Sequence, residues 1–233
     1  MDSILHQPPE DREPAPNRAR FSWLRVLGTL FIITVILGLL SPIIPHGKMS
    51  ADHTEAFNNI RVAGLTLSEF ESIYGKFPDA TTIEKVKAAT GTQLELGSSS
   101  SNQIFRQLLA NPAIVKSEKP FWCKTAWSKK KPDDIFTPGK ALQPGEVGFA
   151  YIAGLSSADD PLTPIVVAPL IPGTTRLDPK AYGEKAIILR LDNSATPMQI
   201  RKDTGEVWWN GMSLFDPRQP FWNGKAPDIK WPE

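Results

Sequence analysis

Three histidines and one cysteine are the side chains of this 233-residue chain best suited to nucleophilic catalysis or transition-metal binding. His6, His46 and His53 all lie near the amino terminus, far in sequence from Cys123. Neither a catalytic triad nor a three-histidine metal centre is therefore expected. No histidine follows His53, so Cys123 lacks a nearby base in sequence and is predicted to be a packed free thiol. His46 and His53 are predicted to be exposed.

Oxygen ligands for calcium are the second candidate chemistry. Acidic and amide side chains occur in several predicted loops, but their spacing matches no EF-hand loop. We expect these side chains to cap their own turns, and a calcium site is the alternative. The residues are Asp159, Asp160, Asp178, Asp192, Asn193, Asp203 and Glu206.

Lysines and tryptophans form the remaining clusters. The lysine run 129–131 is expected to be a solvated loop, with contact to anionic lipid or to another subunit as alternatives. Six tryptophans could stack on glycans, although packing in the core and against a sheet is the interpretation we prefer. They are Trp122, Trp127, Trp208, Trp209, Trp222 and Trp231.

The composition excludes several classes of protein. There are 26 Lys and Arg against 25 Asp and Glu, and a net charge of +1 provides no general basic field for nucleic acid. A single cysteine excludes a disulfide framework and a cysteine-built zinc site. No enzymatic activity, cofactor or small-molecule substrate is expected, and no residue is assigned a catalytic, cofactor-binding or metal-binding role.

The sequence also contains one long apolar run near its amino terminus. Residues 26–44 contain no charge, and thirteen of these nineteen are Leu, Ile, Val or Phe. As a helix they span ~28 Å, close to a bilayer core of ~30 Å, which predicts a single transmembrane helix over 21–45. A cleavable secretory signal is the alternative, but the run is longer than usual for one and no Ala-x-Ala site follows promptly.

The charges beside this run predict an orientation. Arg18, Arg20 and Arg25 precede it, and only Lys48 follows closely. The positive-inside rule then predicts a disordered cytoplasmic arm over 1–20, a helix in the cytoplasmic membrane, and an extracytoplasmic domain over 46–233.

An amphipathic helix is predicted over 52–74, because its apolar residues recur at three- and four-residue steps. Gly75 is expected to end it in a left-handed conformation, and Pro78 prevents continuation. Pro42, Pro45 and Gly47 are expected to separate this helix from the apolar run. Two capping boxes predict short helices further on, one opening at Thr81 with Glu84 and one at Ser100 with Gln103.

Short β-type runs follow residue 120, separated by Pro, Gly and Asp. A hairpin turn is predicted at 203–206. Helices first and strands afterwards predict an α+β domain with a small, mostly antiparallel sheet. The predicted strands cover residues 147–153, 165–170, 186–191, 198–202 and 207–209.

This layout resembles type IV pilin-like proteins and type II secretion pseudopilins. The resemblance rests on the helix containing 57–65, on its exit at 74–78 with Tyr, Gly, Lys, Phe and Pro, and on 186–194, which is similar to a late apolar strand and its Asp-containing turn. It implies a helix packed on a sheet, and a structural rather than a catalytic role.

Two family features are absent from this sequence. No Gly-Phe-Thr-Leu-Ile-Glu-like boundary precedes Val26, and no acidic residue lies between Glu13 and Asp52. We therefore expect a pilin-like domain held by an uncleaved helix. The expected function is that of a membrane-anchored pilin-like structural or interaction protein of the cell envelope, such as a secretion-system or pilus accessory, with envelope proteins as partners. The alternative is a tethered binding module for envelope glycans or proteins.

Overall fold

The first helix, α1 (Trp23–Leu40), lies in an amino-terminal unit that ends at Ile44, and a second unit covers Pro45–Glu233. The computed structural model describes residues 23–40 and 43–233, with side chains described at 23, 26–36 and 49–233. The arm expected over 1–20 lies outside the described residues.

The predicted single-pass anchor over 21–45 is wrong. Within the described residues, no helix is both long enough and apolar enough to cross a membrane. Helix α1 has 18 residues and ends at Leu40, and Ile43 and Ile44 of the apolar run belong to the next helix. Helix α2 (Ile43–Tyr74) has 32 residues but carries charged side chains along its length. The localisation deduced from the anchor, in the cytoplasmic membrane with an extracytoplasmic domain, loses its support as well.

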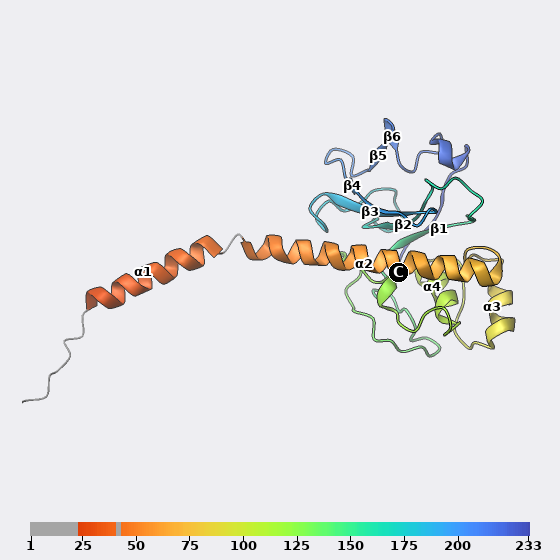
Figure 1. The fold of residues 1–233 in the computed structure, drawn as a ribbon, viewed down its shortest axis with the longest axis horizontal. Helices are drawn as coiled ribbons and strands as arrows, with labels where there is room; N and C mark the ends of the chain where they lie inside the picture. Colours follow the sequence, from red (N-terminus) through yellow and green to blue (C-terminus); the bar gives the residue numbers. More distant parts are fainter. Residues whose placement is uncertain (1–22, 41–42) are drawn as a thin grey trace, which may run out of the picture. The chain divides into compact units, whose positions relative to one another are not determined.

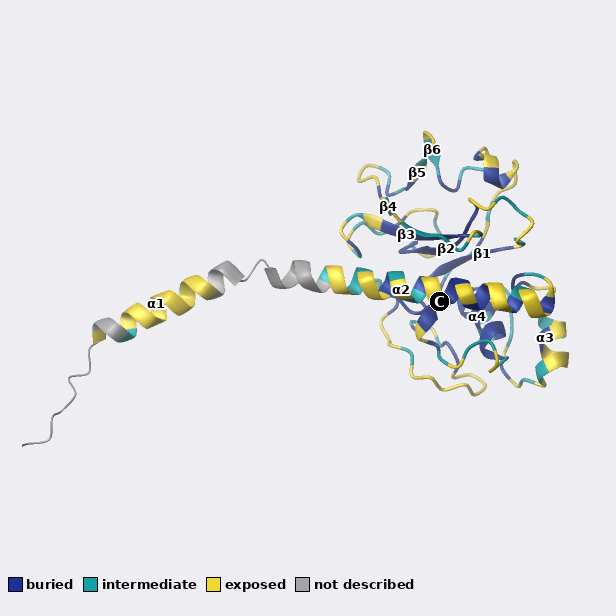
Figure 2. Cartoon of the chain, viewed as in Figure 1, coloured by how far each residue is buried: buried dark blue, intermediate teal, exposed yellow. Residues whose placement is uncertain are grey.

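Helix α2 belongs to the second unit from Pro45 on, and it buries one face against the rest of that unit. Buried and exposed bands alternate along the helix (Figure 2). The buried residues recur every three or four positions, as the sequence pattern predicts. They are Ala56, Ile60, Ala63, Leu67, Phe70 and Tyr74.

The sequence predicted the end of α2 correctly and its start wrongly. The predicted end is confirmed, because Gly75 has a φ of 84° and its N–H donates to the carbonyl of Glu71. The predicted interruption at Pro45 and Gly47 is wrong, because the backbone is helical from Ile43 onward. Pro42, the third residue of that prediction, lies outside the described residues. A proline is tolerated in a first turn, where its missing N–H would have no helical partner.

Two shorter helices follow, α3 (Ile83–Thr90) and α4 (Ser101–Leu109). The capping box at Ser100 is confirmed in part, since its hydroxyl accepts the N–H of Gln103. The box at Thr81 is wrong: the N-cap of α3 is Thr82, whose side chain makes no cap bond. Asp79 instead accepts the N–H and the hydroxyl of Thr81.

Five strands form one antiparallel sheet in the order β4-β3-β2-β1-β7. Their bounds are β1 (Ala150–Ala153), β2 (Pro164–Ala168), β3 (Lys185–Arg190), β4 (Ala195–Gln199) and β7 (Asp228–Lys230). A separate hairpin joins β5 (Trp208–Trp209) to β6 (Met212–Ser213). Two 3₁₀ turns, η1 (Lys119–Phe121) and η2 (Pro220–Trp222), complete the elements. The turn predicted at 203–206 is confirmed by the bridge between Ile200 and Val207.

The sheet is covered on both faces. Figure 1 shows α2 along one face and the β5–β6 hairpin beyond the other. Alternate residues of β3 belong to separate hydrophobic clusters: Ile187 and Leu189 pack with α2, whereas Ala186 and Ile188 pack with the carboxy-terminal segment. The second cluster includes Phe221 and Trp222, and was not predicted from the sequence.

Gly64 marks the closest approach of α2 to the sheet. A methyl group at this position would clash with the side-chain oxygen of Asn193, in the turn between β3 and β4, and would press on Leu189. We expect Gly64→Ala to destabilise the fold by about 1–3 kcal/mol, although alanine is the better helix former. Urea denaturation of the full chain measures this change.

The control for this prediction is Gly64→Ala combined with Asn193→Gly. Asn193 has a φ of 62°, which glycine adopts freely, and its removal opens the space that the methyl group needs. The double variant should recover most of the lost stability. Equal losses in the two variants would mean that the clash with Asn193 is not the cause.

Candidate interaction surface

Histidine and cysteine do not form a reactive site among the described residues. His53 is half-buried between Phe57 and Tyr182, so its predicted exposure is wrong. Burial, and secondarily Lys185, lowers the pKa of His53. Cys123 is buried as predicted, and burial raises the pKa of its thiol to about 12, so the thiol stays protonated near neutral pH. His6 lies outside the described residues, as does the side chain of His46.

The loop acids are spread over separate turns. Within the residues described, no three His, Cys, Asp or Glu side chains gather in a way that could hold a metal ion. Asp159 accepts the N–H of Ser156, and Asp178 that of Lys180, which is the predicted capping role. Asp160, Asp192 and Asp203 likewise accept N–H groups in their own turns. Glu206 accepts the indole N–H of Trp208, and the side-chain oxygen of Asn193 is buried without a partner.

The tryptophans divide between core and surface. Trp122 and Trp222 are buried, as the packing interpretation predicts, and Trp127, Trp209 and Trp231 are half-buried. Trp208 alone of the six is exposed, at 40%, and the guanidinium of Arg201 lies over its ring at 4.5 Å. These six residues therefore do not form an open stacking platform.

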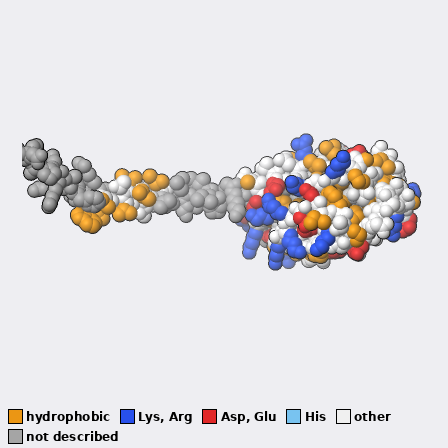
Figure 3. Space-filling view, turned by 90° about the horizontal axis from the view of Figure 1, so that it is seen from below, with side chains coloured by type: hydrophobic (Ala, Val, Ile, Leu, Met, Phe, Trp, Pro, Cys, Tyr) orange, Lys and Arg blue, Asp and Glu red, His pale blue; other side chains and the backbone are white. Residues whose placement is uncertain are grey.

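A basic surface is the strongest feature that remains. Residues 116–140 carry seven lysines against three acidic residues, a net charge of +4 in a chain whose total is +1. The rest of the chain therefore carries −3. Figure 3 shows basic side chains gathered toward one end of the second unit. Such asymmetry favours contact with an acidic partner surface.

We call residues 129–136 the basic loop. It begins with three exposed lysines and ends with Ile135 and Phe136, which are 44% and 38% exposed. Lys131 lies over the ring of Trp122 at 4.8 Å and is 3.7 Å from Glu55. Among the described residues, Lys129 and Lys130 have no salt bridge of this kind. The loop therefore combines the positive charges of Lys129 and Lys130 with exposed apolar side chains. It also contains Asp133 and Asp134, so its net charge is +1.

Glu118 holds this loop in place, and the sequence analysis did not identify it. Its carboxylate is buried and accepts the N–H of Leu142 at 2.8 Å and the N–H of Asp134 at 3.0 Å. In return, the N–H of Glu118 donates to the carboxylate of Asp134 at 2.8 Å. The two residues are sixteen positions apart, so no local spacing predicts the pair. Asp134 has a φ of 60°, and the carboxylate of Asp133 accepts the N–H of the adjoining Ile135 at 3.0 Å.

Burial raises the pKa of Glu118, and the two amide donors only partly offset that effect. Burial also raises the pKa of nearby Glu146. Burying these two carboxylates therefore carries an electrostatic cost.

Comparisons with known proteins identify no relative: no family model, no curated protein and no solved structure matches this chain. The function must therefore be argued from the residues themselves.

Proposed function

We propose that this chain is a pilin-like structural or interaction protein, which docks on other proteins as an accessory of a pilus or secretion assembly. The sequence resemblance supports this role through the helix around residues 57–65 and its exit at 74–78. The packing of α2 on an antiparallel sheet agrees with the arrangement that the resemblance implies.

The observation that carries the proposal is the uncovered apolar surface of α1. Besides Trp23, seven large apolar side chains of this helix are 42–70% exposed. Exposed apolar patches of this kind mark interaction sites, because leaving them in water is unfavourable. The residues are Leu27, Leu30, Phe31, Ile32, Ile33, Val35 and Ile36.

A module that binds glycans is the second candidate, and it rests on Trp208. One face of its ring is already covered by Arg201, and its indole N–H donates to Glu206 at 3.2 Å. These contacts leave less of the ring for a sugar, so the protein-docking role has the stronger support.

Photo-crosslinking tests the proposal. A benzophenone side chain in place of Phe31, which is 70% exposed, should give discrete covalent adducts with partner proteins in the native host. The matched control carries the same side chain in place of Ala88, an exposed residue of α3. Adducts should be identified by mass spectrometry.

Replacing Leu27 and Leu30 with serine in the Phe31-labelled chain should abolish the adducts, since it removes neighbouring apolar area. The same protein adducts at Ala88, or none at position 31, would refute docking through α1.

A further inference from the structure

The basic loop presents an apolar anchor in a fixed position. Phe136 follows Asp134 by two residues, and Asp134 is held by its paired hydrogen bonds to Glu118. A fixed loop loses less conformational entropy on binding than a mobile one, which favours recognition of a surface of defined shape. A lipid surface has no such shape requirement.

A small pocket lies on the other side of the second unit. Its volume is 260 Å³, below the ~300–1,000 Å³ typical of sites for drug-sized ligands, so it suits a single side chain. Its apolar lining includes Ile152, Leu155, Phe221 and Trp222. We call it the η2 pocket, because two of these residues belong to η2.

Two acidic side chains and one lysine are among the residues that line this pocket. Asp159 and Asp228 line it, and Asp160 follows Asp159 in the chain. The nearby cations are Lys225 and Lys230, and Lys230 is already paired with Asp228 at 2.9 Å. The residues that line the pocket therefore carry one carboxylate more than ammonium groups, and this small negative balance suits an incoming basic segment.

We propose that the basic loop of one copy of this chain inserts Phe136 into the η2 pocket of a second copy. Phe136 fills the apolar interior, and Lys129 and Lys130 face the carboxylates around it. This inference rests on the proposed function and names a second copy as one protein partner. Charge complementarity favours that partner, because three lysines outnumber Asp133 and Asp134 in the loop, whereas Asp159 and Asp228 outnumber Lys225 in the pocket lining.

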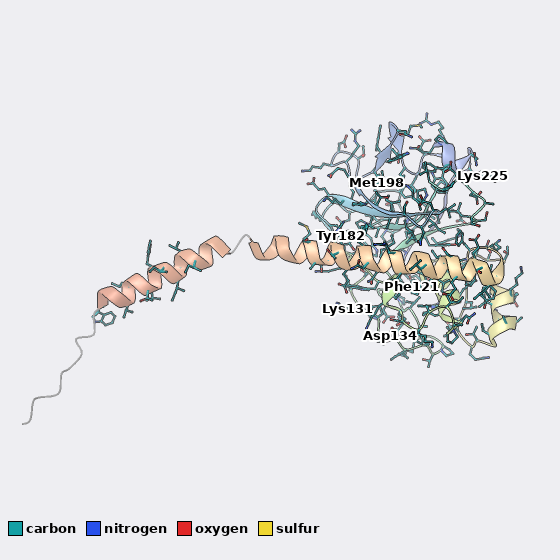
Figure 4. All side chains as sticks on the ribbon, viewed as in Figure 1. Phe121, Lys131, Asp134, Tyr182, Met198 and Lys225 are labelled. Carbon is teal, nitrogen blue, oxygen red and sulfur yellow. The ribbon has the colours of Figure 1, made fainter. Side chains whose placement is uncertain are left out.

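The two surfaces cannot meet within one copy. Figure 4 places Lys131 and Asp134 on one side of α2 and Lys225, which lines the pocket, beyond the sheet on the other side. The contact is therefore heterologous: each copy keeps one free loop or one free pocket, and further copies can add. A contact made by one loop is small, so we expect weak and salt-sensitive association.

Crosslinking between differently labelled copies tests this contact. One full-length copy carries Thr137→Cys, next to the anchor, and the other carries Ala226→Cys, in the pocket lining; both positions are exposed. Cys123 is buried and does not compete for a thiol crosslinker. Mixing the copies with a short bismaleimide should give a crosslinked heterodimer at low salt. The matched control pairs the Thr137→Cys copy with an Ala88→Cys copy.

Charge variants supply the second readout. Replacing Lys129, Lys130 and Lys131 with serine in the Thr137→Cys copy should lower the heterodimer yield about tenfold. Replacing Lys85, Lys87 and Lys202, which are also exposed, should leave the yield unchanged. Equal yields in the Ala226 and Ala88 mixtures, or equal effects of the two lysine triples, would overturn the proposal.

The outcomes also separate this contact from the proposed function. Protein adducts at position 31 without a heterodimer between positions 137 and 226 would mean that the partner is another protein, and would refute the second copy. Failure of both experiments would refute the docking role as well. Label at position 137 that reports only binding to anionic vesicles, with no heterodimer, would replace the copy contact with a lipid contact.

Discussion

Replacing Leu67 with alanine is expected to lower the free energy of unfolding by about 2–5 kcal/mol. Leu67 is 1% exposed and lies in the middle of the buried face of α2, within the cluster that includes Leu189 of the sheet. Removing its branched end leaves a cavity, and a close-packed cluster that joins residues of α2, α4 and the sheet has little room to relax. Urea denaturation of the full chain, followed by the fluorescence of buried Trp122 and Trp222, measures the change.

Leu65→Ala is the matched control, because the same substitution is made two residues away in the same helix. Leu65 is 60% exposed, so its loss should change stability by no more than about 0.5 kcal/mol. Glu69→Ala, also on the exposed face, should cost equally little. Similar small effects at positions 65 and 67 would show that α2 is not docked on the sheet.

The second large effect is expected for Glu118→Gln, which should lower stability by about 2–4 kcal/mol near neutral pH. The carboxylate accepts two backbone N–H groups, from Leu142 and Asp134, and an amide has only one oxygen to offer. The amide NH₂ would then face a backbone donor that has lost its acceptor. Glu95→Gln, at an exposed position, is the control and should have no measurable effect.

The pH dependence of stability gives an independent check on Glu118. Burial raises its pKa in the folded state, so the folded chain binds more protons than the unfolded chain between the two pKa values. Its contribution to stability is therefore greatest below the unfolded pKa and is lost as the pH rises through the folded pKa. Glu118→Gln should flatten this part of the profile but not abolish the slope, because Glu146 also has a raised pKa. An unchanged profile would mean that Glu118 is not buried as a carboxylate.

Fixing the basic loop is the expected purpose of Glu118. If so, Glu118→Gln should also weaken the crosslink between positions 137 and 226 at temperatures where the variant stays folded. That result would connect the buried carboxylate to docking. A full-yield crosslink in a destabilised variant would show that the loop needs no fixed geometry.

Local sequence signals predicted that a helix or strand exists better than they predicted where it begins. The end of α2 follows from Gly75 alone, because a positive φ is a local requirement that glycine meets without strain. The helix start was misplaced, since Pro45 is compatible with a first turn and only the backbone reveals which role it takes. Strand β4 begins at Ala195, three residues before the predicted run at 198, because the register with β3 sets its limits.

The membrane span predicted from the apolar run shows that composition alone does not predict a transmembrane helix. The described residues of the apolar run are helical, as expected, but within the described part of the chain no helix is long and apolar enough to cross a membrane. The sequence also predicted a packed thiol at Cys123 and turn-capping acids such as Asp159. Both predictions needed only the properties of the residue and its near neighbours in the chain.

The sequence by itself determined the helices, most strands and their turns, because periodicity, glycine and proline act over a few residues. Only the tertiary structure decided which residues those helices and strands pack against. The second core behind the sheet, which joins Ile188 to Phe221 and Trp222, depends on contacts more than thirty positions apart. The pairing of Glu118 with Asp134 and the placement of the basic loop opposite the η2 pocket are of the same kind. Such contacts arise from burying area and satisfying buried polar groups across the whole chain, and no local pattern records them.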